Sequence, residues 1–128
     1  MPVTYQIDPA ERVIRTCCSS PVTLSEVIEH FRTLQNDPAC SGSLDVLLDV
    51  SDADPLPDSA QIGAVKTELS AIRGKVQFGI CAVIATRDAM FGMMRMFEVL
   101  AGPYFLAIRV FRGKPEAEAW MLSQRAAR

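Results

Sequence analysis

The ten residues Val76–Ala85 constrain the fold more than any other stretch, because nearly all of them are apolar. Strands with one solvated face alternate apolar and polar side chains, whereas a strand that is covered on both faces is apolar throughout. The run therefore predicts a strand with packing layers on both of its sides. Such strands are typical of largely parallel sheets in α/β proteins.

Strand-like and helix-like segments alternate along the rest of the chain. The chain opens with two strand-like runs separated by Asp8–Glu11, whose Asp and Pro favour a turn, so a hairpin is predicted. The order β-β-α-β-α-β-α-β-α predicts right-handed crossovers and a mixed, mostly parallel sheet with an N-terminal β-hairpin and four helices. In chain order the predicted elements are the strands Val3–Ile7 and Arg12–Cys18, a helix from Thr23 to Asp37, the strand Leu44–Val50, a helix from Asp58 to Gly74, the strand Val76–Ala85, a helix that is capped by Thr86 or Asp88 and reaches about Ala101, the strand Phe105–Phe111, and a helix from Pro115 through Trp120.

Two helix starts are marked by capping boxes. Thr23 is followed three residues later by Glu26, and Asp58 is followed at the same spacing by Gln61. In such a pair each side chain accepts a hydrogen bond from the backbone N–H of the other residue. These pairs therefore predict where the first two helices begin.

Composition limits the classes of function. A chain of 128 residues with 49% hydrophobic and 22% charged residues can bury the core of one domain, which is predicted to span residues 1–128. The net charge of −2 argues against nucleic acid or an anionic membrane as a partner. The longest apolar-looking stretch, Met90–Ala101, is shorter than the roughly 20 residues that span a bilayer, so no integral membrane segment is expected.

The cysteines and the N-terminus bear on the compartment. The first residues show no secretory signal. Cys17, Cys18, Cys40 and Cys81 lack the Cys-x-x-Cys spacing of zinc and thioredoxin-type redox sites. Reduced thiols in the cytoplasm are therefore expected.

Residues for catalysis are sparse. The single histidine, His30, lies at the margin of the first helix's apolar stripe, with no Ser or Cys beside it in the sequence. Glycine-rich phosphate loops are missing as well. We therefore expect no catalytic residue and no cofactor. A hydrolase-type activity around His30 is the enzymatic alternative, and it needs a Ser or Cys nucleophile brought to His30 by the fold.

The densest group of carboxylates surrounds the end of the strand Leu44–Val50. Carboxylate oxygens suit hard cations, but the glycine-turned calcium-loop spacing is absent and two prolines interrupt the group. Helix capping, turn formation and solvation account for these residues, so no metal site is expected. The group consists of Asp45, Asp49, Asp52, Asp54 and Asp58.

The loop that follows this strand carries a family resemblance. Asp49-Val50-Ser51 and, further on, Asp58-Ser59-Ala60-Gln61-Ile62 resemble the signature of STAS domains, the fold of bacterial anti-sigma factor antagonists. In that family a strand ending in Asp-Leu-Ser is followed by a short loop and by Asp-Ser-Ser-Gly-Leu at a helix start. The order of elements predicted above is also the STAS order. The resemblance implies a surface that binds a protein partner and is switched by phosphorylation of a serine.

The departures from that signature change the expectation. Ala60 occupies the position of the family's phosphate acceptor, and Gln61 replaces its glycine, so Ser59 is the only hydroxyl left at the helix start. Asp58 and Ser59 are also ordinary helix-capping residues. The segment Ser51–Ile62 is therefore expected to be a stiff docking loop whose switch function is lost.

A second resemblance covers nearly the whole chain. Arg87–Glu98, Arg109–Arg112 and Glu116–Trp120 are similar to a bacterial subgroup of STAS-like proteins that shares features with CRAL-TRIO lipid-binding domains. This likeness implies the fold. It implies no general activity.

Four of the six methionines fall within Met90–Met96. On a helical projection Met90 and Met94 share a core-facing stripe with Phe97, whereas Phe91 lies on the other side, near Arg95. Methionine suits irregular cores and adaptable binding surfaces alike. The surplus of apolar residues suggests a dimer contact or a pocket for an apolar ligand.

Two hypotheses of function follow. The first is a non-enzymatic STAS-like regulatory domain that binds a protein partner, or a second copy of itself, through the Ser51–Ile62 loop; its site residues are Asp49, Ser51, Asp58 and Ser59. The alternative is a domain that binds a lipid or another apolar small molecule in a pocket under the helix Met90–Ala101. Its site residues are Met90, Phe91, Met94 and Arg95.

Overall fold

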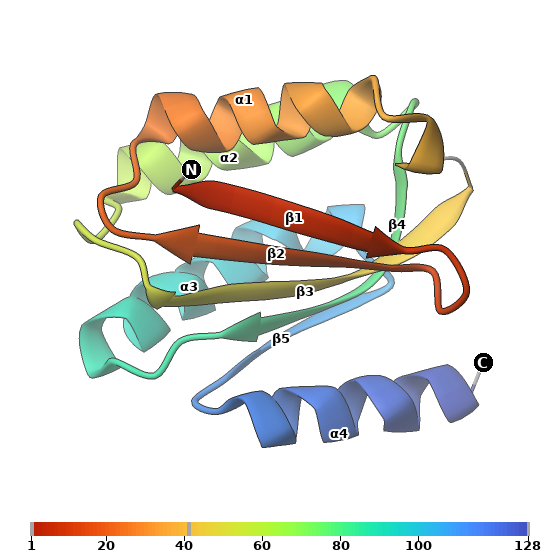
Figure 1. The fold of residues 1–128 in the computed structure, drawn as a ribbon. Coiled ribbons are helices and arrows are strands. Elements are labelled where there is room, and N and C mark those ends of the chain that lie inside the picture. Colours follow the sequence, from red (N-terminus) through yellow and green to blue (C-terminus); the bar gives the residue numbers. More distant parts are fainter. Residues whose placement is uncertain (1, 41, 128) are drawn as a thin grey trace.

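The computed structural model describes residues 2–40 and 42–127, and within them the chain forms one five-stranded mixed sheet (Figure 1). The strands lie side by side in chain order. The first pair is antiparallel and the other neighbours are parallel, which confirms the predicted hairpin and the mostly parallel sheet. The strands are β1 (Val3–Asp8), β2 (Val13–Ser19), β3 (Ser43–Asp52), β4 (Gln77–Ile84) and β5 (Ala107–Phe111).

Helices cover both faces of this sheet (Figure 1). Three of them pack over one face, and α1 and α2 lie next to each other there. The last helix packs alone against the opposite face, where Ala117 and Met121 contact β3 and β4 residues such as Leu47 and Ile80. The helices of the described chain are α1 (Leu24–Gln35), α2 (Ser59–Ile72), α3 (Asp88–Ala101) and α4 (Lys114–Ala126), with short 3-10 turns η1 (Pro38–Cys40) and η2 (Gly102–Tyr104).

The apolar run Val76–Ala85 lies in the sheet as predicted. Ile80, Cys81 and the residues through Ala85 are buried, since β4 lies between β3 and β5 and under helices on both faces. Alternate side chains of this strand enter the two cores: Cys81 and Val83 face α3, whereas Ala82 faces α4.

Both predicted capping boxes are present. The Thr23 hydroxyl accepts a hydrogen bond from the Glu26 N–H at 3.2 Å, and the Glu26 carboxylate accepts one from the Thr23 N–H at 3.0 Å. Asp58 and Gln61 make the same pair of bonds at 2.8 and 2.9 Å. The starts of α1 and α2 are therefore fixed by their own sequences.

The predicted cap of α3 is wrong. Arg87 is the N-cap residue of this helix and makes no side-chain capping bond, and Thr86 precedes it. Asp88 is the first helical residue, and its carboxylate binds Arg112 instead of the helix backbone. An acidic residue in the first turn still stabilises the helix dipole, which explains why the position favours Asp.

Candidate binding pocket

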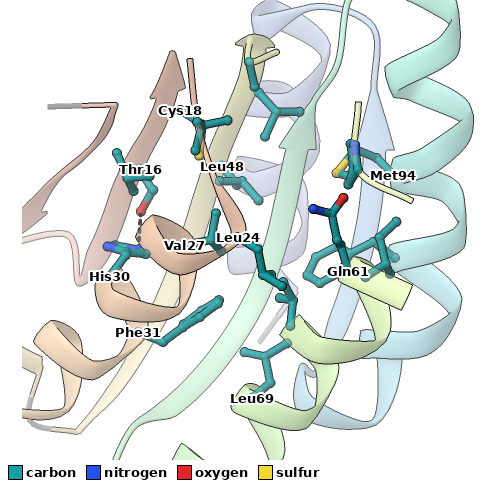
Figure 2. Close-up of a pocket in the computed structure, with 18 of the residues that line it drawn as sticks. Thr16, Cys18, Leu24, Val27, His30, Phe31, Leu48, Gln61, Leu69 and Met94 are labelled. Carbon is teal, nitrogen blue, oxygen red and sulfur yellow. Dashed lines mark hydrogen bonds between the residues drawn. The ribbon is translucent and has the colours of Figure 1, made fainter. Parts of the chain in front are cut away.

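An apolar pocket of about 170 Å³ lies between the sheet and the layer formed by α1, α2 and α3 (Figure 2). Almost all of its lining is aliphatic or aromatic. The lining comprises Val3, Ile14, Thr16, Cys18, Val22, Thr23, Leu24, Val27, His30, Phe31, Leu34, Val46, Leu48, Val50, Ala53, Pro55, Pro57, Gln61, Ile62, Val65, Leu69, Phe78, Cys81, Met90, Met94, Phe97 and Phe105.

Helix α1 explains why the pocket exists. Its apolar stripe includes Leu24, Val27 and Phe31, yet each of these side chains is only half-buried, and Leu34 alone in this fully described helix is buried. All of them line the pocket. The helix therefore turns its apolar face toward the sheet without packing closely on it.

The side chains of the central strand β3 also indicate that the helices do not pack closely on the sheet. Val46 and Leu48 lie between two neighbouring strands and under a helix layer, yet they are half-buried. Interiors are normally packed to crystal-like density, so side chains at such positions are usually fully enclosed. An engineered cavity of about 150 Å³ with a similar lining stays dry and binds benzene. The pocket is thus large enough for a small apolar molecule.

The pocket opens beside the starts of α1 and α2. Thr23 and Pro55 are the exposed residues of the lining described above, and Pro57 and Gln61 are half-buried next to them. This edge is where the parallel strands end, which is the usual place for binding sites in open α/β sheets. The side chain of Gln61 lies across the pocket from that of Leu24 in the close-up (Figure 2).

The chain segments around this opening are tied together. The Val22 N–H donates to the Asp54 carbonyl oxygen at 3.0 Å, and the Ser20 hydroxyl donates to the Asp52 carbonyl oxygen at 2.8 Å. The Arg87 guanidinium donates to the Ala53 carbonyl oxygen. These bonds connect the β2–α1 and β3–α2 segments with the start of α3, so they hold the rim in place.

The four residues expected to form a docking loop do not gather at one site. Asp49 and Ser51 point to the α4 face of the sheet, since alternate side chains of a strand face opposite sides and Val50 lines the pocket. The Asp49 carboxylate accepts a hydrogen bond from the Ser51 N–H at 2.9 Å. Asp58 and Ser59 are exposed at the start of α2, outside the lining, and Asp58 caps the helix.

The four residues of the predicted methionine site do not lie together either. Met90 and Met94 are buried and line the pocket together with Phe97. Met94 is labelled in the close-up (Figure 2). Phe91 lies outside the pocket, with the Arg112 guanidinium 4.3 Å above its ring, and Arg95 is exposed. The helical period explains the division, because positions four apart share a face and neighbouring positions do not.

His30 lies inside the pocket, on the α1 side. Its Nε2 is 3.5 Å from the Thr16 hydroxyl of β2 (Figure 2). Its ring contacts Tyr5 and Phe31 at centroid distances of 5.2 and 5.6 Å. Burial lowers the pKa of His30 to about 4, so the imidazole is neutral at physiological pH. Thr16 was not a predicted site residue; its only signal is a polar residue on the inward face of a strand, between Ile14 and Cys18.

The thiols near the pocket are poor nucleophiles. Burial raises the pKa of Cys18 to about 11 and raises the pKa of Cys81 as well. A thiol with a raised pKa holds little thiolate at neutral pH. In the part of the chain that the structure describes, no group of three His, Cys, Asp or Glu side chains could hold a metal ion.

The acidic group predicted at the end of β3 is dispersed. Asp45 is buried on the α4 face, where its carboxylate accepts a hydrogen bond from the Ile80 N–H at 2.9 Å and lies 3.4 Å from Arg125 Nε. Asp58 caps α2, and Asp54 lies 3.9 Å from the Arg87 guanidinium. Asp45, Asp54 and Asp58 thus serve three separate structural contacts.

Comparison with known proteins adds no assignment. The sequence matches no protein-family model, and no curated protein matches it significantly. The resemblance to STAS domains therefore stays a prediction. None of the helices within residues 2–40 and 42–127 is both long enough and apolar enough to cross a membrane.

Proposed function

We propose that this protein binds a small, largely apolar molecule in the pocket between its sheet and the helices α1, α2 and α3. The observation that carries the proposal is the partial exposure of Val46 and Leu48 on the central strand, beneath the loosely seated apolar face of α1. Ligand sites are typically concave, mostly apolar and few per protein. The methionine side chains of α3 support the same function, because their flexible chains adapt to a bound shape.

The binding role is non-enzymatic. His30 is neutral and contacts a threonine, and the thiols near it are held protonated by burial. The Thr16 hydroxyl lies within hydrogen-bond reach of the His30 imidazole, but an imidazole whose pKa is lowered to about 4 is a weak base for activating that hydroxyl. Free thiols throughout the described chain also support a location in the reducing cytoplasm.

A toluene titration followed by methyl NMR tests the proposal. Methyl signals of Val27, Leu48 and Met94 should shift saturably, and the signal of Val99, which is 76% exposed on α3, should not. Val27→Phe, whose ring takes up part of the pocket and leaves too little room for toluene, should abolish the shifts of Leu48 and Met94. Val99→Phe is the matched control and should retain them. A folded wild-type protein that shows no saturable shift contradicts the proposal.

A protein partner at the Ser51–Ile62 loop is a second candidate, and it is favoured by the loop's own structure. Leu56 is 41% exposed at the centre of a segment whose rim contacts hold it in place. Exposed apolar side chains on a rigid loop are suitable anchors for a protein partner or a second copy of the chain. Leu56→Ser should abolish complex formation in cross-linking and leave toluene binding unchanged. If this variant forms complexes as well as the wild type does, the loop is not the binding site for the partner.

A further inference from the structure

The pocket contains one polar pair in an otherwise apolar interior. Thr16 projects from β2 and is only 4% exposed, and His30 faces it from α1 at 3.5 Å (Figure 2). The opposite wall carries Met94 and Leu69. A buried polar pair is costly unless its hydrogen bonds are made, so its presence in this lining calls for an explanation.

Both groups retain hydrogen-bonding capacity. A threonine hydroxyl offers one donor and two acceptor positions, and a neutral imidazole offers one donor and one acceptor. The contact between them is at the long limit for a hydrogen bond, and neither side chain makes another one to residues 2–40 or 42–127. The neighbouring Tyr5 hydroxyl is already occupied, because it donates to Asp37 at 2.7 Å.

The position of the pair is fixed by its surroundings. The His30 ring contacts the rings of both Tyr5 and Phe31, and Thr16 belongs to a strand with partners on both sides. Such a pair is preorganised, which reduces the entropy lost when a ligand binds. A polar group on a bound ligand would therefore meet a donor and an acceptor at a defined place in the pocket.

The charges around the pocket disfavour an anionic ligand. The lining drawn from the described residues contains no Lys, Arg, Asp or Glu, so no side chain there can neutralise a carboxylate. At the opening, the Arg87 guanidinium donates to the Ala53 carbonyl oxygen and lies 3.9 Å from the Asp54 carboxylate. The carboxylates of Glu26 and Asp58 cap the starts of α1 and α2. They compensate the positive ends of those helices, and an ion taken into an apolar pocket without a partner loses its hydration.

Resting on the proposed function, we infer that the pocket selects an uncharged molecule of about the size of a monocyclic aromatic that carries one hydroxyl or carbonyl group, and that Thr16 and His30 bind this group. The volume of about 170 Å³ sets the size limit. The neutral polar pair sets the chemical class. Thr16 and His30 thus determine specificity in a site whose affinity comes from apolar contact.

The test compares three probes of the same shape: toluene, benzyl alcohol and benzoate. Dissociation constants are measured by NMR titration for the wild type and for Thr16→Val, which replaces the hydroxyl by a methyl group of similar size. The ratio of benzyl alcohol affinity to toluene affinity should fall in this variant by a factor on the order of ten, as expected for one net hydrogen bond. His30→Phe should lower the same ratio. Benzoate should not bind to the wild type.

The controls separate this inference from the proposed function. Thr4→Val changes an exposed threonine of β1 and should leave the ratio of benzyl alcohol affinity to toluene affinity unchanged. Thr16→Ser keeps a hydroxyl and should retain most of the wild-type ratio. A wild type that binds toluene, with a ratio that neither Thr16→Val nor His30→Phe changes, overturns the role of the pair and leaves the proposed function standing. Benzoate binding as tight as that of benzyl alcohol overturns the selection of uncharged ligands. A wild type that binds neither toluene nor benzyl alcohol overturns the proposed function itself. Thermal denaturation checks each variant, and if Thr16→Val does not fold, His30→Phe decides.

Discussion

Filling the pocket should make the protein more stable. At about 24 cal/mol per Å³, an unfilled space of about 170 Å³ costs roughly 4 kcal/mol, which is an upper limit because the pocket opens to solvent at Thr23 and Pro55. A phenyl ring at position 27 occupies part of that space. Val and Phe have similar helix propensities, so the change adds little cost to α1 itself. Val27→Phe is therefore expected to raise the free energy of unfolding by about 1 kcal/mol.

Urea denaturation followed by circular dichroism measures this effect. Leu122→Phe is the control, since Leu122 is 70% exposed on α4 and a change there should alter the free energy by less than about 0.5 kcal/mol. If native side chains already occupied the space, the larger ring would overpack the core and cost about 1–3 kcal/mol. A decrease of that size for Val27→Phe, with a neutral control, would refute the unfilled pocket.

Three further predictions concern other parts of the fold. Arg125→Ala should lower the free energy of unfolding by about 1–3 kcal/mol, because it removes a guanidinium that lies 3.4 Å from the buried Asp45 carboxylate; urea denaturation measures it, and a loss below about 0.5 kcal/mol contradicts it. Thr23→Ala and Asp58→Ala should each lower the free energy of unfolding by about 1 kcal/mol, because each removes a helix cap. In urea denaturation, a variant as stable as the wild type would argue against the corresponding capping box. The folded pKa of His30 of about 4 lies below its unfolded value of 6.5. The stability that the buried neutral imidazole contributes is therefore fully present above pH 6.5 and is lost as the pH falls toward 4. The difference in unfolding free energy between the wild type and His30→Phe should therefore shrink by up to about 3 kcal/mol over that range, and a constant difference would contradict a buried neutral imidazole.

Local signals in the sequence predicted the elements and their order. Capping at Thr23 and Asp58 depends on residues three positions apart, and the coverage of β4 on both faces follows from the continuous apolar run Val76–Ala85. Both are visible in a short window. The cap of α3 was predicted wrongly because Asp88 binds Arg112, which lies 24 residues away.

The pocket depends on how closely elements approach each other, and no sequence window contains that distance. The apolar stripe of α1 was predicted as an inward face, but a stripe that packs and a stripe that borders a pocket have the same pattern. From the sequence, the loop Ser51–Ile62 and the helix Met90–Ala101 are two separate candidate sites. In the structure, Pro55 and Pro57 of the loop and Met90 and Met94 of α3 border the same space.

The contact between Thr16 and His30 could not be predicted from the sequence, for a related reason. Thr16 and His30 are only 14 residues apart, but one lies on a strand and the other on a helix across the pocket. Their meeting depends on how closely α1 approaches β2. A polar residue in an inward strand position, as at Thr16, is the local signal that was available.

A crystal structure under xenon pressure tests the pocket most directly, because xenon enters dry apolar cavities of this size. A xenon atom should bind among Val27, Leu48 and Met94, and the Val27→Phe variant should bind none there. Wild-type crystals that show no xenon at this place, with the side chains of Phe31 and Met94 packed against β3, would contradict a ligand pocket.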